Sequence, residues 1–503
     1  MKNVKNLLAA VMACVLVLAL ATTAFAAEVT NKTPGHTYDA YQVFTGSQNE
    51  GDPALARIDW GTGVNGTALL EDLKAEYNYF DSCTSALDVA KVLEGKPDRC
   101  DEANALAEVA YDNLTNVKTT IVPAETVELE AGYWLIVDTT DVDGDHDAKN
   151  LALLQVTNDG DLEINKKYDT PDAVKKVYDI NDTTGETEGR EDSADHDIGD
   201  TVTFEITATL GDDMDSYKTY KVVFHDTMDA GLTYQEVVSI TLDGNDVTDD
   251  FTAVHNNGKL TITCDDVKAL GATNNSVIVV TYTAILNENA VVGATGNKNT
   301  MYMEFSNDPN WEYEYDPENP PETPPTPPTG FTPEDKVIVF TYTAVVDKVD
   351  EDGQPLTGAQ FTLSKKIDGE WVVIDTVVVT ENGTTFTWKG VDDGDYKLEE
   401  TVTPPGYNTM EPIEFTITAE HDAESADPKL ENLEADVTSG SEELAFEFSA
   451  ESGIIHAEIE NLPGTVLPET GGMGTTVFYI VGGLMVAAAV VLLVTKKRMA
   501  ISE

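Results

Sequence analysis

A dense group of potential ligand side chains is the segment Asp141-Val-Asp-Gly-Asp-His-Asp147, with four carboxylates and one imidazole in seven residues. Carboxylate oxygens are the ligands that Ca²⁺ prefers, and an EF-hand loop adds a bidentate glutamate at its twelfth position. Counted from Asp141, the twelfth residue is Ala152, which has no side-chain oxygen. We therefore interpret this segment as an acidic surface loop and not as a calcium site.

Other motifs for catalysis or metal binding are absent from the sequence. The seven histidines form no H-E-x-x-H pattern and no cluster with metal-ligand spacing. No G-x-S-x-G segment and no glycine-rich phosphate loop is present. We therefore expect no metal, no cofactor and no enzyme with turnover.

Both ends of the chain carry segments typical of an exported, membrane-inserted precursor. Lys2 and Lys5 precede an apolar run over residues 7–21, and Ala24-Phe-Ala26 closes it. This pattern predicts a signal peptide over residues 1–26. Near the other end, residues 477–494 carry no charge and are followed by Lys496-Lys-Arg498. Eighteen apolar residues are about the minimum for a transmembrane helix, and the basic cluster stays in the cytoplasm.

The residues just before that apolar run resemble the LPxTG sorting signal of Gram-positive surface proteins. They are Leu467, Pro468, Glu469, Thr470 and Gly471. The resemblance implies that a sortase cuts between Thr470 and Gly471 and passes the Thr470 carbonyl to an amine. Motif, apolar run and basic tail occur in the order that such a signal requires. An ordinary C-terminal membrane anchor is the alternative.

Composition agrees with a surface protein. The chain has 91 acidic and 30 basic residues, and its net charge is −61. Such a charge excludes nucleic acid as a partner, because the phosphates would be repelled. It also disfavours adsorption to anionic lipid and favours solubility. The acidic residues are spread among alternating apolar residues, which predicts a folded chain and not an acidic disordered tail.

Three cysteines remain once Cys14 has left with the signal peptide. Cys83 and Cys100 flank a helical stretch, and an exported chain permits a disulfide between them. Two reduced thiols that are merely close are the alternative. Cys264 ends the strand-like segment Leu260-Thr-Ile-Thr-Cys264 and is expected to be a small buried side chain.

The rest of the chain is predicted to be mainly β, with three domains in series. Residues 27–168 combine strand-like pieces with helical spacing, and residues 169–315 alternate as in a β-sandwich. Residues 316–333 form a proline-rich linker, because paired prolines favour extended and semi-rigid backbone. Residues 334–464 again consist of short strands and turns. Residues 465–503 hold the sorting signal, the transmembrane helix and the basic tail.

This arrangement resembles the backbone subunit of sortase-assembled Gram-positive pili. The resemblance implies Ig-like, Cna-type sandwiches, each able to form a spontaneous isopeptide bond between a lysine on its first strand and an asparagine on its last. A buried Asp or Glu promotes the bond, since burial lowers the lysine pKa and raises the pKa of the acid. Each molecule does this once, so the process is maturation and not turnover.

The third domain fits this pattern best. Val346-Asp-Lys348-Val resembles the family's first strand, with Lys348 as nucleophile. The segment Tyr396–Tyr407 resembles the family's E-box, with Glu400 as the acid. Ala457-Glu-Ile-Glu-Asn461 resembles the last strand, with Asn461 as electrophile. A surface ion pair between Lys348 and Glu400 is the alternative.

The second domain resembles the family's other sandwich type. The resemblance implies Lys176 as nucleophile, in preference to Lys175, and Asp226 as the acid. Asn299 and Asn307 both fit the closing strand, and Asn299 is preferred. Turn asparagines and solvated charges are the alternative here.

A polymerising pilin also needs an acceptor amine, which the family places between its first two domains. Leu162-Glu-Ile-Asn-Lys166-Lys167 lies at that place, with Lys167 at the motif lysine and Lys166 as the alternative. The aromatic residue and the proline of the family motif are missing here.

We therefore interpret the chain as a structural shaft subunit of a covalent, wall-anchored pilus that mediates adhesion and colonisation. Its expected partners are a sortase, other copies of itself in a head-to-tail polymer, the cell-wall peptidoglycan and host surface ligands. The alternative is a wall-anchored adhesin that does not polymerise. In that protein the sorting signal would be joined to the cell-wall peptide, and Lys167 would have no role.

Overall fold

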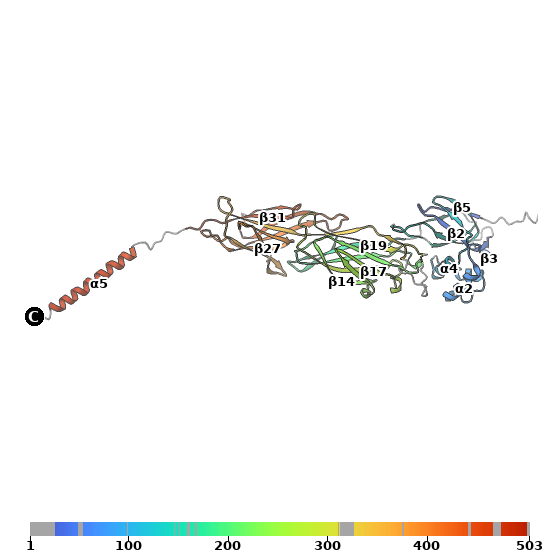
Figure 1. Cartoon of the computed structure of the whole chain (residues 1–503), viewed down its shortest axis with the longest axis horizontal. Helices are drawn as coiled ribbons and strands as arrows, with labels where there is room; N and C mark the ends of the chain where they lie inside the picture. Colours follow the sequence, from blue (N-terminus) through green and yellow to red (C-terminus); the bar gives the residue numbers. More distant parts are fainter. Residues whose placement is uncertain are drawn as a thin grey trace, which may run out of the picture.

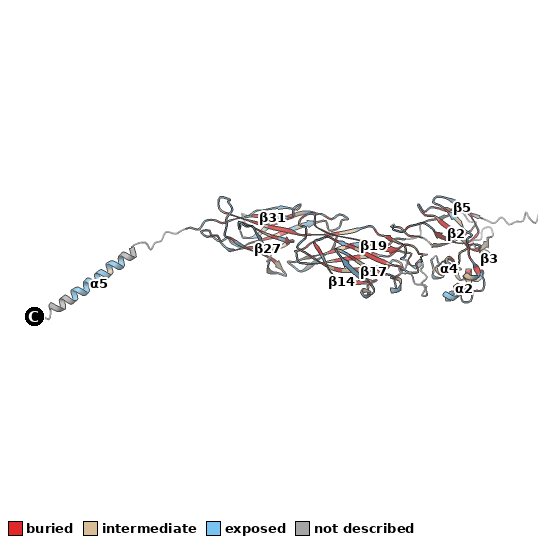
Figure 2. Cartoon of the chain, in the orientation of Figure 1, coloured by how far each residue is buried: buried red, intermediate tan, exposed pale blue. Residues whose placement is uncertain are grey.

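The structure is a computed structural model that describes residues 26–499, except 49–53, 98, 145, 150, 158–160, 166–168, 310, 312–325, 375–376, 441–443 and 466–473. Three β-rich bodies follow one another in a row, and a single helix lies beyond the last of them (Figure 1). Buried residues gather on the strands inside each body (Figure 2). The predicted order of three β-rich domains is therefore present.

The N-terminal domain combines two sheets with a helical layer. Strand β1 pairs with β5 and β8, while β2 lies at the centre of the other sheet and pairs with β3, β4 and β6. Helices α2 and α3 begin where Asn65 and Ser85 accept hydrogen bonds from backbone N–H groups in the first turn. The elements are β1 (Ala26–Asn31), β2 (Tyr38–Ser47), β3 (Ala56–Trp60), α2 (Gly66–Glu76), η1 (Asn78–Phe80), α3 (Ala86–Leu93), α4 (Asp101–Asp112), β4 (Thr119–Ile121), β5 (Thr126–Glu130), β6 (Gly132–Asp138), β7 (Leu151–Val156) and β8 (Leu162–Ile164).

The second domain is a sandwich of two sheets, in the orders β10-β9-β12-β18-β14-β15 and β11-β21-β19-β13-β17-β16. Alternate residues of β18, from Ile278 to Leu286, are buried, so one face of the strand packs in the core. The elements are β9 (Asp172–Asn181), β10 (Glu186–Glu191), β11 (Ser193–Asp195), β12 (Thr201–Thr209), η2 (Met214–Ser216), β13 (Val222–Met228), β14 (Leu232–Leu242), β15 (Asn245–Asp246), η3 (Thr248–Asp250), β16 (Thr252–Asn256), β17 (Lys259–Cys264), η4 (Lys268–Leu270), β18 (Val277–Leu286), β19 (Asn297–Ser306), β20 (Thr329–Phe331) and β21 (Asp335–Phe340).

Strands β20 and β21 lie at the boundary that the sequence places between the second and third domains. Both pair with β19, and β21 also pairs with β11. Residues 329–340 therefore belong to a sheet of the second domain, although the sequence assigns them to the linker and the third domain. Only Thr341 separates the end of β21 from Tyr342, the first residue of the next strand, so the chain passes into the third domain without a long spacer.

The third domain is a second sandwich, with sheets in the orders β25-β26-β22-β31-β30 and β24-β23-β27-β28-β29. Its first strand, β22, pairs in parallel with β31, the last strand before the C-terminal helix. The elements are β22 (Tyr342–Val349), β23 (Gln360–Ile367), β24 (Glu370–Ile374), β25 (Val377–Val379), β26 (Thr385–Val391), β27 (Gly394–Val402), β28 (Ile413–His421), β29 (Leu430–Ser439), β30 (Phe446–Ser449) and β31 (Ile454–Glu460).

The apolar C-terminal segment forms helix α5 (Gly474–Met499). Among the described residues, no helix is both long enough and apolar enough to cross a membrane. The transmembrane helix over residues 477–494 therefore stays a prediction.

Candidate functional site

The third domain brings together the lysine, acid and asparagine that the sequence singles out. Lys348 lies near the end of β22, opposite Ile459 of β31, and Asn461 follows that strand directly. Glu400 comes from β27 in the facing sheet. Lys348 is fully buried, and Asn461 and Glu400 are 1% and 8% exposed. The alternative of a surface ion pair is therefore wrong, because neither charged group lies at the surface.

Hydrogen bonds fix the orientation of these three side chains. The Lys348 amine donates to the carbonyls of Ile459 at 2.7 Å and Val349 at 2.8 Å, while the backbone N–H of Asn461 donates to Val349 at 3.2 Å. The Asn461 amide donates to both oxygens of Glu400, at 2.8 and 3.1 Å. The other amide atom, Asn461 Oδ1, has no hydrogen-bond partner among the described residues.

Burial lowers the pKa of Lys348 to about 8, although the negative charge of Glu400 works in the opposite direction. A sizeable fraction of the amine is therefore neutral near pH 8, and only the neutral form has a lone pair for nucleophilic attack. The carboxyl group of Glu400 is held by Thr403 Oγ1 at 3.2 Å and by the N–H of Met410 at 3.0 Å. The site thus contains an amine, a carboxamide and an acid in fixed positions.

The second domain holds a similar group, but with a different lysine from the one preferred on sequence. Lys175 is fully buried, and its amine contacts Asp226 Oδ2 and Tyr282 Oη. Lys176 points to the other side of β9, where its amine lies 2.7 Å from Asp192. The preference for Lys176 is therefore wrong, because neighbouring residues of a strand face opposite sides of the sheet.

Asp226 and Asn299 come from neighbouring strands, β13 and β19, and both are buried. Asn299 donates to Tyr282 Oη at 2.9 Å, and Tyr282 donates to Asp226 Oδ2 at 2.7 Å. Burial lowers the pKa of Lys175, while the Asp226 carboxylate opposes this shift. Tyr282, which the sequence analysis did not single out, therefore connects the acid to the asparagine.

The alternative asparagine, Asn307, lies at a different place. Its amide donates to the carbonyls of Val142 at 2.6 Å and Asp147 at 3.2 Å, both in the acidic loop of the first domain. Asp143 of that loop also accepts a hydrogen bond from the N–H of Thr329. The segment Asp141–Asp147, predicted as a surface loop, thus contacts the second domain, and of the two asparagines only Asn299 faces the Lys175 site.

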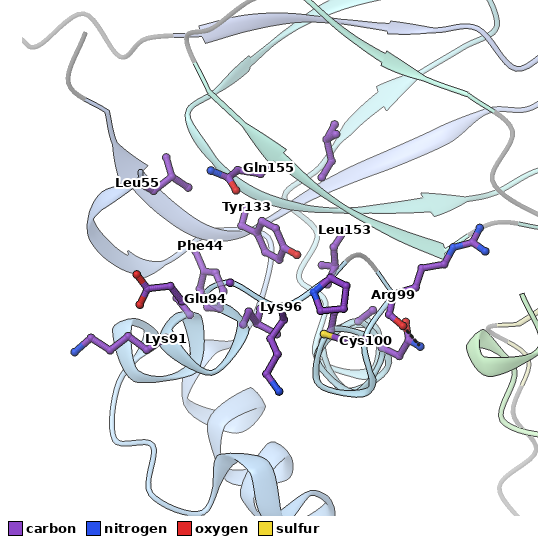
Figure 3. A pocket seen from close by; sticks show the side chains of 18 of the residues that line it. Phe44, Leu55, Lys91, Glu94, Lys96, Arg99, Cys100, Tyr133, Leu153 and Gln155 are labelled. Atoms are coloured by element: carbon purple, nitrogen blue, oxygen red, sulfur yellow. Dashed lines mark hydrogen bonds between the residues drawn. The ribbon is translucent and has the colours of Figure 1, made fainter. Parts of the chain in front are cut away.

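The predicted disulfide is absent, and Cys83, Cys100 and Cys264 are all free thiols. Cys83 is buried in the core of the first domain, whereas Cys100 precedes α4 and lines a pocket. This pocket of about 790 Å³ lies between α3, α4 and strands of the first domain (Figure 3). Cys264 is buried as predicted.

Two predicted elements lie outside the described residues. These are the sorting signal, residues 467–471, and the candidate acceptors Lys166 and Lys167. The described residues on either side of the acceptors are Asn165 and Asp169.

Comparison with known families gives two matches. Residues 343–430 match the SpaA prealbumin-like fold domain, which corresponds to most of the third domain. Residues 463–500 match the LPXTG cell wall anchor motif. This match indicates a surface protein anchored to the cell wall.

Similar proteins come from Streptococcus pyogenes and Corynebacterium diphtheriae. The chain is 24% identical over 365 residues to the trypsin-resistant surface T6 protein of Streptococcus pyogenes serotype M6, and the match covers 60% of this chain and 65% of that protein. The chain thus spans just under two thirds of the length of this curated relative. The solved T6 backbone pilin is similar with a TM-score of 0.50 and 19% identity, over 88% of this chain and 98% of that one. The major pilin SpaD of Corynebacterium diphtheriae gives a TM-score of 0.44 and 16% identity, over 87% and 97%. The T6 comparison supports a shared three-domain fold.

Proposed function

We propose that this chain is the backbone subunit of a covalent pilus, joined head to tail by a sortase and stabilised by an isopeptide bond in each of its last two domains. The observation that carries the proposal is the buried lysine, acid and asparagine present in both sandwiches. The anchor motif and the similarity to a backbone pilin support it. The two cross-linking domains are then of the Ig-like, Cna type.

The proposed internal reaction follows from the contacts in the third domain. Neutral Lys348 attacks the side-chain carbonyl carbon of Asn461, and a new N–C bond forms. Glu400, whose two oxygens accept hydrogen bonds from Asn461 Nδ2, takes the lysine proton and passes it to that amide nitrogen. The bond from that carbon to Nδ2 breaks and ammonia leaves. In the second domain Lys175, Asn299 and Asp226 take these roles, and Tyr282 lies between the last two.

The bond would hold the ends of each domain together under tension. In the third domain it ties the first strand to the last, which are parallel neighbours. Each backbone hydrogen bond between these strands has a net contribution of only about 1 kcal/mol to the stability of the fold. A covalent bond between the same two strands transmits a pulling force directly from one to the other, so the rest of the domain does not bear it. A shaft subunit needs this property, because every subunit of a chain bears the whole load.

The proposed intermolecular reaction uses the sorting signal. Sortase cuts the bond between Thr470 and Gly471, releases the C-terminal segment and transfers the Thr470 carbonyl to the amine of Lys167 on another copy. Since donor and acceptor are different surfaces of the same chain, the product grows as a filament and does not close into a dimer.

The acceptor is tested in cells that express the chain together with its sortase. We expect an immunoblot of wall extracts boiled in detergent to show a ladder of high-mass species for the wild type. We expect the Lys167→Ala variant to lose the ladder and to be anchored as single subunits, since its own sorting signal is intact. Lys149→Ala is a matched control, because this lysine of the first domain pairs with Asp308 and has no proposed role. A ladder that persists in the variant would move the acceptor to Lys166, and monomers from the wild type would support the adhesin alternative.

The unlinked third domain should show a pH dependence set by Lys348. In an Asn461→Ala ectodomain this lysine stays buried with a pKa of about 8, below its ordinary 10.5. The folded state then binds fewer protons than the unfolded state between these values. The free energy of unfolding should therefore rise as the pH increases from 8 towards 10.5, as measured by urea denaturation. A double variant with Lys348→Met should lose this rise, and an equal rise in both proteins would contradict a buried amine.

A further inference from the structure

The junction between the second and third domains encloses two groups of carboxylates. In the first group, Asp182 and Asp197 of the second domain and Asp392 of the third surround the amine of Lys365. Two of these contacts measure 2.6 Å, to Asp182, and 3.0 Å, to Asp197. Lys365 is 1% exposed and belongs to β23 of the third domain. The first group therefore contains a permanent cation, which offsets part of its negative charge.

The second group consists of Asp179 on β9, Asp195 on β11 and His421 at the end of β28. Each residue offers one ligand atom, and these atoms lie within 4.8 Å of one another. Asp179 and Asp195 are 5% and 3% exposed, and the His421 side chain is 10% exposed. No lysine or arginine in the described part of the chain forms an ion pair with either carboxylate. This group therefore lacks the permanent cation that its neighbour has.

The hydrogen bonds of His421 define the state of its ring. Ser193 Oγ donates its single hydrogen to the carbonyl of Asp422 at 3.0 Å. In its 2.8 Å contact with His421 Nδ1 the hydroxyl must therefore accept, so Nδ1 carries a hydrogen. The other nitrogen, Nε2, lies 3.3 Å from Asp179 Oδ2. If the ring were neutral, the lone pair on Nε2 would face the Asp179 carboxylate, and the two would repel each other. A positive charge between Nε2 and the carboxylate is needed to remove this repulsion.

Tyr342 is a second, independent indication that this buried polar group binds a further ligand. This residue is fully buried, and its hydroxyl lies beside Asp195. The hydroxyl interacts with Asp195 but makes no hydrogen bond of good geometry with any described residue. A buried hydroxyl without a well-formed hydrogen bond is costly, which favours a further ligand or ligand-bound water in this space.

We propose that Asp179, Asp195 and His421 bind a first-row divalent cation, such as Zn²⁺ or Mn²⁺, which joins the second domain to the third. One imidazole with two carboxylates suits these ions, whereas Ca²⁺ prefers oxygen ligands alone. The contact from Nδ1 to Ser193 orients the ring in the way that histidine ligands of metals usually require. Two carboxylates and one divalent ion give a neutral, buried site.

The test is calorimetric titration of the EDTA-treated ectodomain with ZnCl₂ and, separately, MnCl₂. We expect saturable binding of one ion per chain. Asp195→Asn and His421→Ala should each abolish this binding. His225→Asn is the control and should leave it unchanged, because His225 pairs with a single carboxylate, Glu304, at 2.8 Å. Cooperative thermal unfolding shows that each variant is folded.

Two results would overturn the proposal. One is the absence of saturable uptake of either ion by the wild type. The other is uptake that persists unchanged in folded Asp195→Asn and His421→Ala chains, which would place the ions elsewhere on this acidic surface.

Discussion

The Glu400→Gln ectodomain should be heavier than the wild type by one ammonia, after correction for the substitution itself. Glutamine has nearly the same shape as glutamate but cannot deliver a proton to the Asn461 amide, so Lys348 and Asn461 stay unlinked. The bond in the wild type closes a loop of about 113 residues. By analogy with disulfides, the loss of such a cross-link costs about 4 kcal/mol of stability. Intact-mass spectrometry and thermal denaturation measure the two effects.

Glu399→Gln is the control for this change. Glu399 is adjacent in sequence but pairs with Lys397 at 3.0 Å and makes no described contact with Asn461. This variant should keep the wild-type bond and unfold near the wild-type temperature. A Glu400→Gln protein that still loses the full amount of ammonia would show that Glu400 is not required for the bond.

The Lys175→Met ectodomain should likewise retain one ammonia that the wild type loses, in this case from the second domain. The substitution also leaves the buried Asp226 carboxylate without its cation. Removing one partner of a buried pair typically costs about 3–5 kcal/mol. We therefore expect a larger loss of stability than for Glu400→Gln, measured by urea denaturation beside the intact mass.

Lys176→Met separates the two lysines, because the Lys176 amine contacts Asp192 and not Asp226. The Lys176→Met protein should therefore still lose the ammonia that the second-domain bond releases. Asn299→Ala should abolish the second-domain bond, whereas Asn307→Ala should preserve it and weaken only the contact with the first domain. Loss of the bond in Lys176→Met, or its survival in Lys175→Met, would contradict the geometry of this site.

The third-domain site could be predicted from sequence because each of its residues lies in a segment with its own pattern. Lys348 is next to a run of alternating apolar residues, Glu400 lies in an E-box, and Asn461 directly follows a strand. The choice in the second domain was harder, because Val174 and Val177 flank the two lysines and lie at positions of opposite parity. The structure shows that Ala173, Lys175 and Val177 face the core, whereas Val174 is exposed.

Other features depend on contacts between segments that are distant in the sequence. Tyr282 occupies an inward position of β18, as a core residue would, and only the fold places its hydroxyl next to Asp226. Lys365 and His421 are single cations of the third domain. Apart from Asp392, which contacts Lys365 from within the third domain, their carboxylate partners come from strands and loops of the second domain. Such a junction leaves no local spacing that sequence analysis could detect.

The pilus assignment is tested most directly by tandem mass spectrometry of the high-mass species, digested after purification from the wall. The account predicts a branched peptide in which the carbonyl of Thr470 forms an amide with the side chain of Lys167. If Thr470 is instead found joined only to the cell-wall peptide in every species, the chain is an anchored surface protein and not a polymerising subunit.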